Sequence, residues 1–345
     1  SLTWFAGKGS RSDACEARDD ASLTPLIPPV QRGLLDFSFR TPTWREAEER
    51  SAGMDYNDCD VEVVMFEREN QEIYIPDGGD NPLEALARTT HLAVAAHQDD
   101  IEIMAFDGIL KAFENEDSHF SGCIVTDGHG SPRAGKFRQV NDDEMAAVRM
   151  EEQKEAARAG NYSALVFLGY GSHSVKKSGN KQLLEDLQNL VKLTRPEIIY
   201  THNLADKHHT HVGVTLRLVE ALRGLPAEFL PQKLIGCEVW RGLDWLPDDQ
   251  KVIFDLSERK DLQRELVEVF ASQTQEKNYV DAILGRRAAN ATFFASHVTD
   301  RSSGLGFGMD LTPLLEDPGL APEVFLRRVL KSFENEVMNL LEDSL

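Results

Sequence analysis

The chain lacks the features of several protein classes. It has 345 residues, with 37 Lys and Arg against 58 Asp and Glu, which gives a net charge of −21 at pH 7. Nucleic acids and anionic membranes both attract basic surfaces, so we expect neither as a partner. No apolar run approaches the roughly 18 residues of a transmembrane helix. The N-terminus shows no charged segment followed by an apolar one, so we expect no signal peptide.

Cysteine is scarce, and no Cys-x-x-Cys spacing occurs. The four cysteines are Cys15, Cys59, Cys123 and Cys237, and their spacing argues against a cysteine zinc site. Cys123 and Cys237 lie in apolar runs and are expected to be buried thiols. This usage fits a reducing compartment, so we expect a cytoplasmic protein. The Gly-x-Gly-x-x-Gly fingerprint of dinucleotide binding is also missing after the first strand pattern.

Strand and helix patterns alternate between about residues 91 and 275. The strand patterns are short and apolar on both faces, as in parallel strands covered by helices. They lie at 91–96, 122–126, 164–168, 197–200, 236–239 and 252–255. The helical patterns lie at 142–159, 181–193, 212–222 and 258–270. This alternation predicts a doubly wound, Rossmann-like α/β fold with a mostly parallel sheet flanked by helices.

The chain divides into three parts. Residues 1–90 are predicted to be an N-terminal extension with short edge strands at 61–66 and 72–75. Residues 91–295 are predicted to be the α/β domain, and residues 296–345 a C-terminal helical extension.

The C-terminal extension contains two patterns. A Gly-rich turn is expected at 304–308, and an amphipathic helix from 322 to about 341. The apolar stripe of this helix is expected to pack within the chain, with a homo-oligomer contact as the alternative.

Two clusters of polar side chains follow two of the strand patterns. Residues 92–104 read LAVAAHQDDIEIM, an apolar run that changes abruptly to His97-Gln98-Asp99-Asp100. The second cluster, at 206–211, reads DKHHTH and follows the strand pattern at 197–200. Ligands of open α/β sheets bind at the carboxyl ends of the strands, so we expect the clusters to meet. Imidazoles and carboxylates are typical ligands of Zn²⁺ or another divalent metal.

The spacing assigns a role to each member of these clusters. His97 and Asp100 are three residues apart on an expected turn, and His208 and His211 are three residues apart, so we expect them to share one helix face. We assign His97, Asp100 and His211 to the metal. Asp99 then remains as a general base, and His208 as a group that stabilises an oxyanion or protonates a leaving group. Each cluster alone has a structural reading, as an acidic helix start or a solvated loop, but their joint occurrence favours a metal site.

These clusters resemble the motifs of a known family, the LmbE-like or PIG-L deacetylases. HQDDIE at 97–102 is similar to its H-P-D-D-x-E motif, and DKHHTH at 206–211 to its D-x-H-P-D-H motif. Weaker similarities are Thr126-Asp127-Gly128, Arg149-x-x-Glu152, Asp255-Leu256-Ser257 and Ser272-Gln273. The resemblance covers about residues 91–295.

The resemblance implies a zinc-dependent hydrolase that removes an N-acetyl group from a glucosamine-type or related small molecule. The family's metal ligands correspond to His97, Asp100 and His211. Its general base corresponds to Asp99, and its second catalytic histidine to His208.

Two further residues are candidates for substrate binding. The resemblance implies this role for Arg149, whose structural alternative is an ion pair with Glu151 or Glu152. Asp206 is the second candidate, and it could instead orient a metal-ligating imidazole. The chain departs from the family at Gln98, which replaces Pro, and at 209–210, where His-Thr replaces Pro-Asp. These departures bear on the substrate more than on the metal.

Two other functions remain open. The first is zinc-dependent hydration of an unsaturated acid, which would need a cationic clamp such as Arg133, Arg138 and Arg149 facing the metal. The second is a catalytically silent carbohydrate-binding protein. Asp99 argues against the second, because a pure binding protein has no use for a spare base beside a metal.

Overall fold

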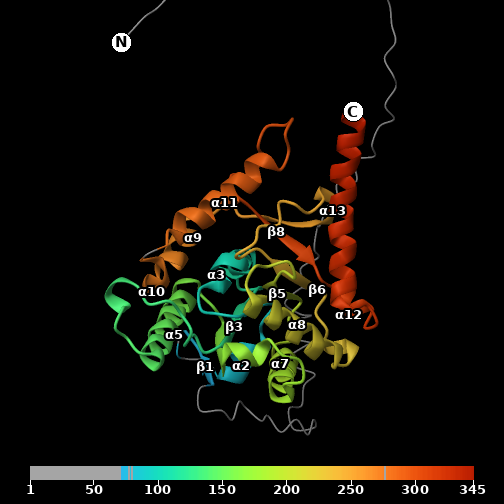
Figure 1. Cartoon of the computed structure of the whole chain (residues 1–345). Coiled ribbons are helices and arrows are strands. Elements are labelled where there is room, and N and C mark those ends of the chain that lie inside the picture. The colour runs from blue at the N-terminus through green and yellow to red at the C-terminus, as the bar shows by residue number, and fades with distance from the viewer. Residues whose placement is uncertain (1–70, 77, 79–80, 276) are drawn as a thin grey trace, which may run out of the picture. The chain divides into compact units, whose positions relative to one another are not determined.

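A computed structural model describes residues 71–76, 78, 81–275 and 277–345; the strand pattern at 61–66 lies outside them. The described residues form an eight-stranded sheet in the order β1-β4-β3-β2-β5-β6-β8-β7 (Figure 1). Its strands are β1 (Glu72–Tyr74), β2 (His91–Ala95), β3 (Phe120–Thr126), β4 (Ala164–Tyr170), β5 (Ile198–His202), β6 (Lys233–Cys237), β7 (Lys251–Asp255) and β8 (Leu305–Asp310).

Helices connect most of these strands. They are α2 (Pro82–Ala87), α3 (Asp100–Met104), α4 (Phe106–Ala112), α5 (Asp142–Ala159), α6 (Ser172–Val175), α7 (Lys181–Thr194), α8 (His209–Arg223), α9 (Lys260–Glu268), α10 (Ala271–Thr274), α11 (Tyr279–Phe293), α12 (Pro313–Glu316) and α13 (Pro322–Ser344). In the described part of the chain, no helix combines the length and the apolar character needed to cross a bilayer.

The centre of the sheet is parallel, which confirms the predicted fold class. Strands β4, β3, β2, β5 and β6 run in one direction, and β1 and β8 are antiparallel to their neighbours. His91 at the start of β2 pairs with Phe120 on one side and Ile198 on the other. The chain proceeds from β2 outward through β3 and β4, and then returns to place β5 on the other side of β2. Ligands bind at such a reversal point in open α/β sheets.

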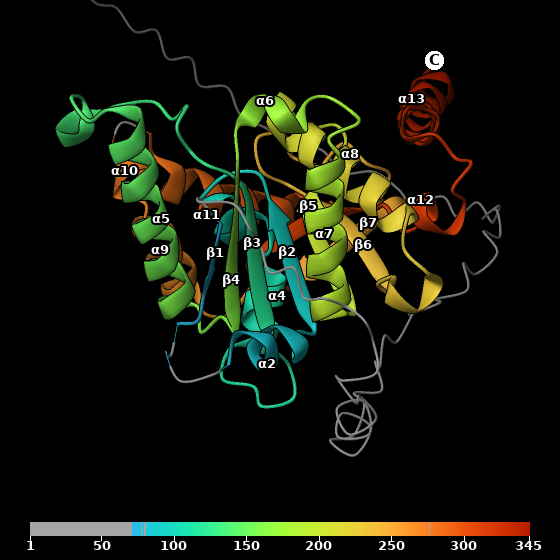
Figure 2. The ribbon, with the colours of Figure 1, turned by 90° about the horizontal axis from the view of Figure 1, so that it is seen from below.

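Both faces of the sheet are covered by helices (Figure 2). Along β2, Leu92 and Val94 belong to the core under α7 and α8, while Ala93 and Ala95 belong to the core under α4 and α9. A strand buried on both faces can be apolar at every position, which is why β2 reads as a continuous apolar run.

The helical pattern at 142–159 is confirmed by α5, which has the same bounds. The Asn141 side chain accepts a hydrogen bond from the Glu144 N–H, and the Glu144 carboxylate accepts one from the Asn141 N–H. This reciprocal capping box fixes where the helix begins. Since α5 packs beside the polar turn after β2, its start also determines which α5 side chains reach the site.

The Gly-rich turn expected at 304–308 is wrong, because residues 305–308 belong to β8. The strand lies between β6 and β7 and is antiparallel to both. A Cβ atom at Gly308 would lie 2.5 Å from Ile235 Cγ2, and one at Gly306 would lie 3.0 Å from Leu256 Cδ1. The glycines therefore allow close packing inside the sheet rather than a turn, and a sequence pattern cannot separate the two uses.

Both flanking segments contribute to the sheet. Strand β1 comes from the predicted N-terminal extension and forms one edge, beside β4; β8 comes from the predicted C-terminal extension. The boundaries near residues 90 and 295 stay predictions. Helix α13 extends the predicted C-terminal helix to Ser344; Phe325 in its first turn is buried, whereas Val337 and Leu341 are about half exposed.

Candidate metal centre

The turn after β2 brings two of the predicted ligands together. The Asp100 carboxylate Oδ2 accepts a hydrogen bond from the His97 N–H at 2.8 Å and lies 3.1 Å from His97 Nδ1. This local contact closes the turn, and α3 begins at Asp100. The two side chains therefore meet because the hydrogen bond from the His97 N–H holds the Asp100 carboxylate beside the His97 ring.

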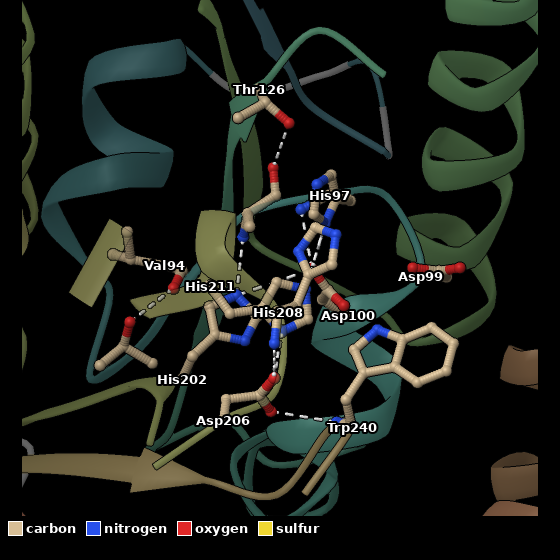
Figure 3. A network of polar contacts seen from close by, with 12 residues as sticks. Val94, His97, Asp99, Asp100, Thr126, His202, Asp206, His208, His211 and Trp240 are labelled. Atoms are coloured by element: carbon tan, nitrogen blue, oxygen red, sulfur yellow. Dashed lines mark hydrogen bonds and ion pairs between the residues drawn. The ribbon is translucent and has the colours of Figure 1, made fainter. Parts of the chain in front are cut away.

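The third predicted ligand comes from α8, and the three side chains converge (Figure 3). His211 Nε2 lies 3.2 Å from His97 Nδ1 and 3.3 Å from Asp100 Oδ2. Four ligands at about 2.0–2.1 Å from a tetrahedral metal are about 3.3 Å apart, so these separations match the edges of such a polyhedron. The donor set of two imidazoles and one carboxylate therefore fits Zn²⁺ or a similar divalent metal in both chemistry and spacing.

His208 lies beside this trio, although it is not within a helix. It is the residue before α8, with an extended backbone conformation, and its side chain is exposed. Its ring lies 4.6 Å from that of His211 and 4.9 Å from that of His97. The predicted shared helix face was thus wrong for His208, but the ring still lies at the open side of the site.

Asp206 supports the imidazole of His211 from behind. Its Oδ1 lies 3.4 Å from His211 Nδ1 and accepts a hydrogen bond from the His208 N–H at 2.8 Å. Its Oδ2 accepts a bond from the Trp240 backbone N–H at 3.0 Å. A carboxylate on the far nitrogen of a ligating imidazole fixes the orientation of the ring. The geometry of Asp206 is therefore that of an orienting group, with its side chain buried away from any substrate.

One residue of the site escaped the sequence analysis. His202 at the end of β5 is fully buried, and its ring stacks on that of His211 with centroids 3.9 Å apart. His202 Nε2 accepts a hydrogen bond from the Ala96 N–H at 2.8 Å and is therefore occupied by the backbone. Its position at the end of an apolar strand that lies beside β2 was the available indication.

Burial and neighbouring charges both shift the pKa values of the site residues. Burial alone would raise the pKa of Asp100, but His211 and His202 outweigh it and hold this pKa well below its usual range. Burial opposes protonation of His211, but Asp100 and Asp206 raise its pKa to about 9. Burial lowers the pKa of His208 to about 4, and His211 and His97 add to the effect. The cluster thus favours an anionic Asp100 balanced by positive charge, which is what a metal cation would supply.

Asp99, the predicted general base, has an unusual backbone conformation. Its φ of 91° lies in the left-handed region, which a residue other than glycine adopts at some cost. The Asp99 N–H donates to Gln153 Oε1 at 3.1 Å, and Gln153 Nε2 donates to Glu102 Oε1 at 2.7 Å. This chain of bonds from α5 and α3 holds the turn. Burial raises the pKa of Asp99, as expected for a carboxyl group that exchanges protons near neutral pH.

Arg149 is buried next to Asp99 rather than exposed to solvent. Its guanidinium donates to Ser131 Oγ and to the Gln98 carbonyl oxygen, and it lies 3.5 Å from Asp99 Oδ2. The expected alternative, an ion pair with Glu151 or Glu152, does not occur among the described contacts. Arg149 therefore holds the turn that carries Asp99.

The weaker motif similarities are connected in space. Glu152 Oε1 accepts a hydrogen bond from the Ser272 N–H at 2.7 Å, which joins the Arg149-x-x-Glu152 pattern to the Ser272-Gln273 pattern. Thr126 Oγ1 donates to the Ala96 carbonyl oxygen at 2.7 Å and joins the ends of β3 and β2 (Figure 3). These contacts brace the walls of the site.

Gln98 stands where the family motif has Pro, and its side-chain amide is buried. Neither polar atom of the Gln98 side chain has a hydrogen-bond partner among the described residues. The amide packs on Gly128, whose φ is +79° and whose Cβ, if present, would lie 2.7 Å from Gln98 Oε1. Gly128 therefore provides both the turn after β3 and the space for this side chain.

The chain was compared with known proteins. The model of the PIG-L family, described as GlcNAc-PI de-N-acetylase, matches residues 92–222. No match was found among curated proteins.

Three solved structures are similar to this chain at low sequence identity. The hydratase GalB, a 4-carboxy-2-hydroxymuconate hydratase from Pseudomonas putida KT2440, is 17% identical, with a TM-score of 0.52 over 65% of this chain and 96% of its own. The conserved protein TT1542 from Thermus thermophilus is 19% identical, with a TM-score of 0.51 over 68% and 99%. The N,N'-diacetylchitobiose deacetylase from Pyrococcus horikoshii is 16% identical, with a TM-score of 0.49 over 64% and 83%.

The family match spans β2 through α8 and so contains both motif clusters and all three candidate ligands. Residues 92–222 therefore form a PIG-L, or LmbE-like, domain.

Proposed function

We propose that this protein is a zinc-dependent N-deacetylase that acts on an N-acetylated small molecule, most simply a glucosamine derivative. The observation that carries the proposal is the convergence of His97 Nδ1, Asp100 Oδ2 and His211 Nε2 within 3.1–3.3 Å of one another. The membership of residues 92–222 in a family described as a de-N-acetylase supports the reaction class.

Each member of the site has a distinct part in amide hydrolysis. His97, Asp100 and His211 would hold the metal. When bound there, Zn²⁺ polarises the amide carbonyl and lowers the pKa of water. Asp99 accepts the proton of the attacking water, for which its raised pKa is suited.

The exposed imidazole of His208 acts on the other side of the scissile bond. It hydrogen-bonds the oxyanion that develops on the amide carbonyl, and a proton passes from Asp99 or His208 to the leaving nitrogen. The products are acetate and a free amine. Asp206 and Arg149 are positioning residues in this proposal, because both bind the protein itself.

The test separates metal binding from catalysis. The purified full chain should bind about one zinc ion, and His97→Ala and His211→Ala should lose it by elemental analysis. Asp99→Asn should keep the metal but release amine from N-acetylated sugars about 10²–10⁴ times more slowly. Asp143→Asn, an exposed carboxylate on α5, is the matched control and should retain full activity. Normal turnover in metal-loaded Asp99→Asn would exclude Asp99 as the base.

The hydratase alternative has less support in the geometry. Arg133 forms an ion pair with Asp142 and donates to the carbonyl oxygens of Ser131 and His129. Arg149 is likewise occupied by contacts within the protein. Two of the three arginines considered for a carboxylate clamp are thus engaged elsewhere. Consumption of an unsaturated acid without amine release from any N-acetylated compound would reverse this preference.

A further inference from the structure

An aromatic side chain at the metal centre has no part in the proposed reaction. Trp240 lies in the loop after β6 and is 40% exposed. Figure 3 shows its indole on the side of the site where Asp99 and Asp100 lie. Its backbone N–H donates to Asp206 at 3.0 Å, and the other oxygen of Asp206 lies 3.4 Å from His211 Nδ1. The loop that carries the indole is therefore fixed to the same carboxylate that orients a metal ligand.

The start of α11 brings a second ring to the first. Tyr279 packs edge-on against Trp240, with ring centroids 6.1 Å apart and an interplanar angle of 79°. Arg286 of the same helix donates to the Val239 carbonyl oxygen at 2.6 Å and ties α11 to the loop. Burial raises the pKa of Tyr279 to about 12, and Asp99 and Asp100 add to the rise, so the phenol lies within electrostatic reach of the site carboxylates.

A lysine ammonium lies over both rings. Lys277 Nζ is 4.5 Å from the Trp240 ring centroid and 5.8 Å from that of Tyr279. Such contacts hold a cation without neutralising it. Within residues 71–76, 78, 81–275 and 277–345, no ion pair joins Lys277 to a carboxylate, in a chain whose net charge is −21. The exposed ammonium can thus pair with an anion from outside the protein.

We propose that Trp240, Lys277 and Tyr279 form a recognition subsite for an anionic N-acetylated sugar, with the sugar ring against the indole and a phosphate or carboxylate substituent on Lys277. The inference rests on the proposed function and adds a substrate class to it. The apolar face of a pyranose suits an amphipathic aromatic ring, and a charged hydrogen bond to an ammonium supplies selectivity. All three residues lie outside residues 92–222, so the family match assigns them no role.

The simpler reading is that the three side chains only pack on one another. Packing alone would make the positive charge of Lys277 irrelevant to any ligand. Replacing the charge while keeping the length of the side chain therefore separates the two readings.

The experiment is calorimetric binding to the zinc-loaded full chain carrying Asp99→Asn, so that turnover does not interfere. The probes are N-acetylglucosamine, N-acetylglucosamine 6-phosphate and N-acetylmuramic acid, which are neutral, phosphorylated and carboxylated. At least one anionic sugar should bind at least about tenfold more tightly than the neutral one. The stronger of the two anionic probes identifies the preferred substituent.

The variants then assign this preference to residues. Lys277→Met should remove the preference for the anion and leave the affinity for the neutral sugar unchanged, and Lys277→Arg should retain it. Trp240→Ala should weaken the binding of all three sugars about tenfold. Lys251→Met is the matched control, since Lys251 also lies over aromatic rings, at 5.2 Å from that of Phe307, but at β7. It should change none of the affinities.

The outcomes distinguish this inference from the proposed function. Equal affinities for the three sugars, an anion preference that survives Lys277→Met, or no binding of any probe overturns the subsite. If the anionic sugar binds as expected but the parent enzyme releases no amine from it, the subsite stands and deacetylation fails. If amine is released from neutral sugars alone, deacetylation stands and the subsite fails.

Discussion

The rings of His202 and His211 stack in the core of the site, with centroids 3.9 Å apart and an interplanar angle of 22°. His202 ends β5, whereas His211 lies in the first turn of α8. His202 also accepts a hydrogen bond from the Ala96 N–H at the end of β2. One buried imidazole therefore joins the two strands that carry the motif clusters and supports a metal ligand from below.

The first prediction concerns this support. His202→Phe keeps an aromatic ring but leaves the Ala96 N–H without its acceptor, so the ring and the turn that carries His97 should shift. We expect zinc affinity to fall about 10–100-fold, the usual effect of losing a partner of the ligand shell. Competition with a chelator measures it. His209→Ala, an exposed neighbour of the ligands, is the control, and equal affinities of the two variants would contradict a supporting role for His202.

The second prediction concerns the buried amide at position 98. Gln98→Met has a similar shape and removes two polar atoms that lack partners among the described residues. Since burying an unpaired polar group is costly, the free energy of unfolding should rise by about 1–2 kcal/mol. Urea unfolding measures it. Loss of stability in Gln98→Met would mean that the amide has a partner, such as ordered water.

The third prediction concerns pH. Burial lowers the pKa of His91 to about 4, and Lys111 adds to the effect while Asp107 opposes it. The unfolded state, with a pKa of about 6.5, binds more protons between these values, so stability falls as the pH drops below about 6.5. Between pH 7 and pH 5 the wild type should lose about 2 kcal/mol more than His91→Gln.

Unfolding at both pH values tests this difference. His173→Gln, at an exposed position, should lose as much stability as the wild type. A His91→Gln variant that is as sensitive to acid as the wild type would remove His91 as the cause.

The fourth prediction concerns β8 and has two arms of opposite sign. Gly308→Ala places a Cβ 2.5 Å from Ile235 Cγ2 inside the sheet and should destabilise the protein by about 1–3 kcal/mol. Gly285→Ala in α11 meets nothing within 4 Å and should stabilise it by about 0.5–1 kcal/mol, because alanine restricts the unfolded chain and favours the helix. Thermal unfolding measures both, and a neutral Gly308→Ala would show that β8 is loosely packed.

Local patterns in the sequence predicted much of the fold. The apolar run before His97 predicted β2, and the capping residues around Asn141 and Glu144 are consistent with a helix starting at Asp142. The expectation that the two clusters meet followed from the rule that parallel strands end at one edge of the sheet. These inferences need only neighbouring residues and the period of a strand or helix.

Other features depend on partners that are distant in sequence. Position 308 in the strand between β6 and β7 requires glycine, because Ile235 and Phe254 occupy the space that a side chain would need. Arg149 could not be separated from a substrate-binding arginine until Ser131 and Gln98 were seen to accept its hydrogen bonds.

The sequence by itself determined the α/β alternation and the residue types that can hold a divalent metal, because both are written in short windows of the chain. Only the tertiary structure decided that His202 lies under His211, that Asp206 faces its outer nitrogen, and that Lys277 lies over Trp240. The physical reason is that each of these contacts joins separate elements. Their distances are set by how the helices pack on the sheet, which no local pattern encodes.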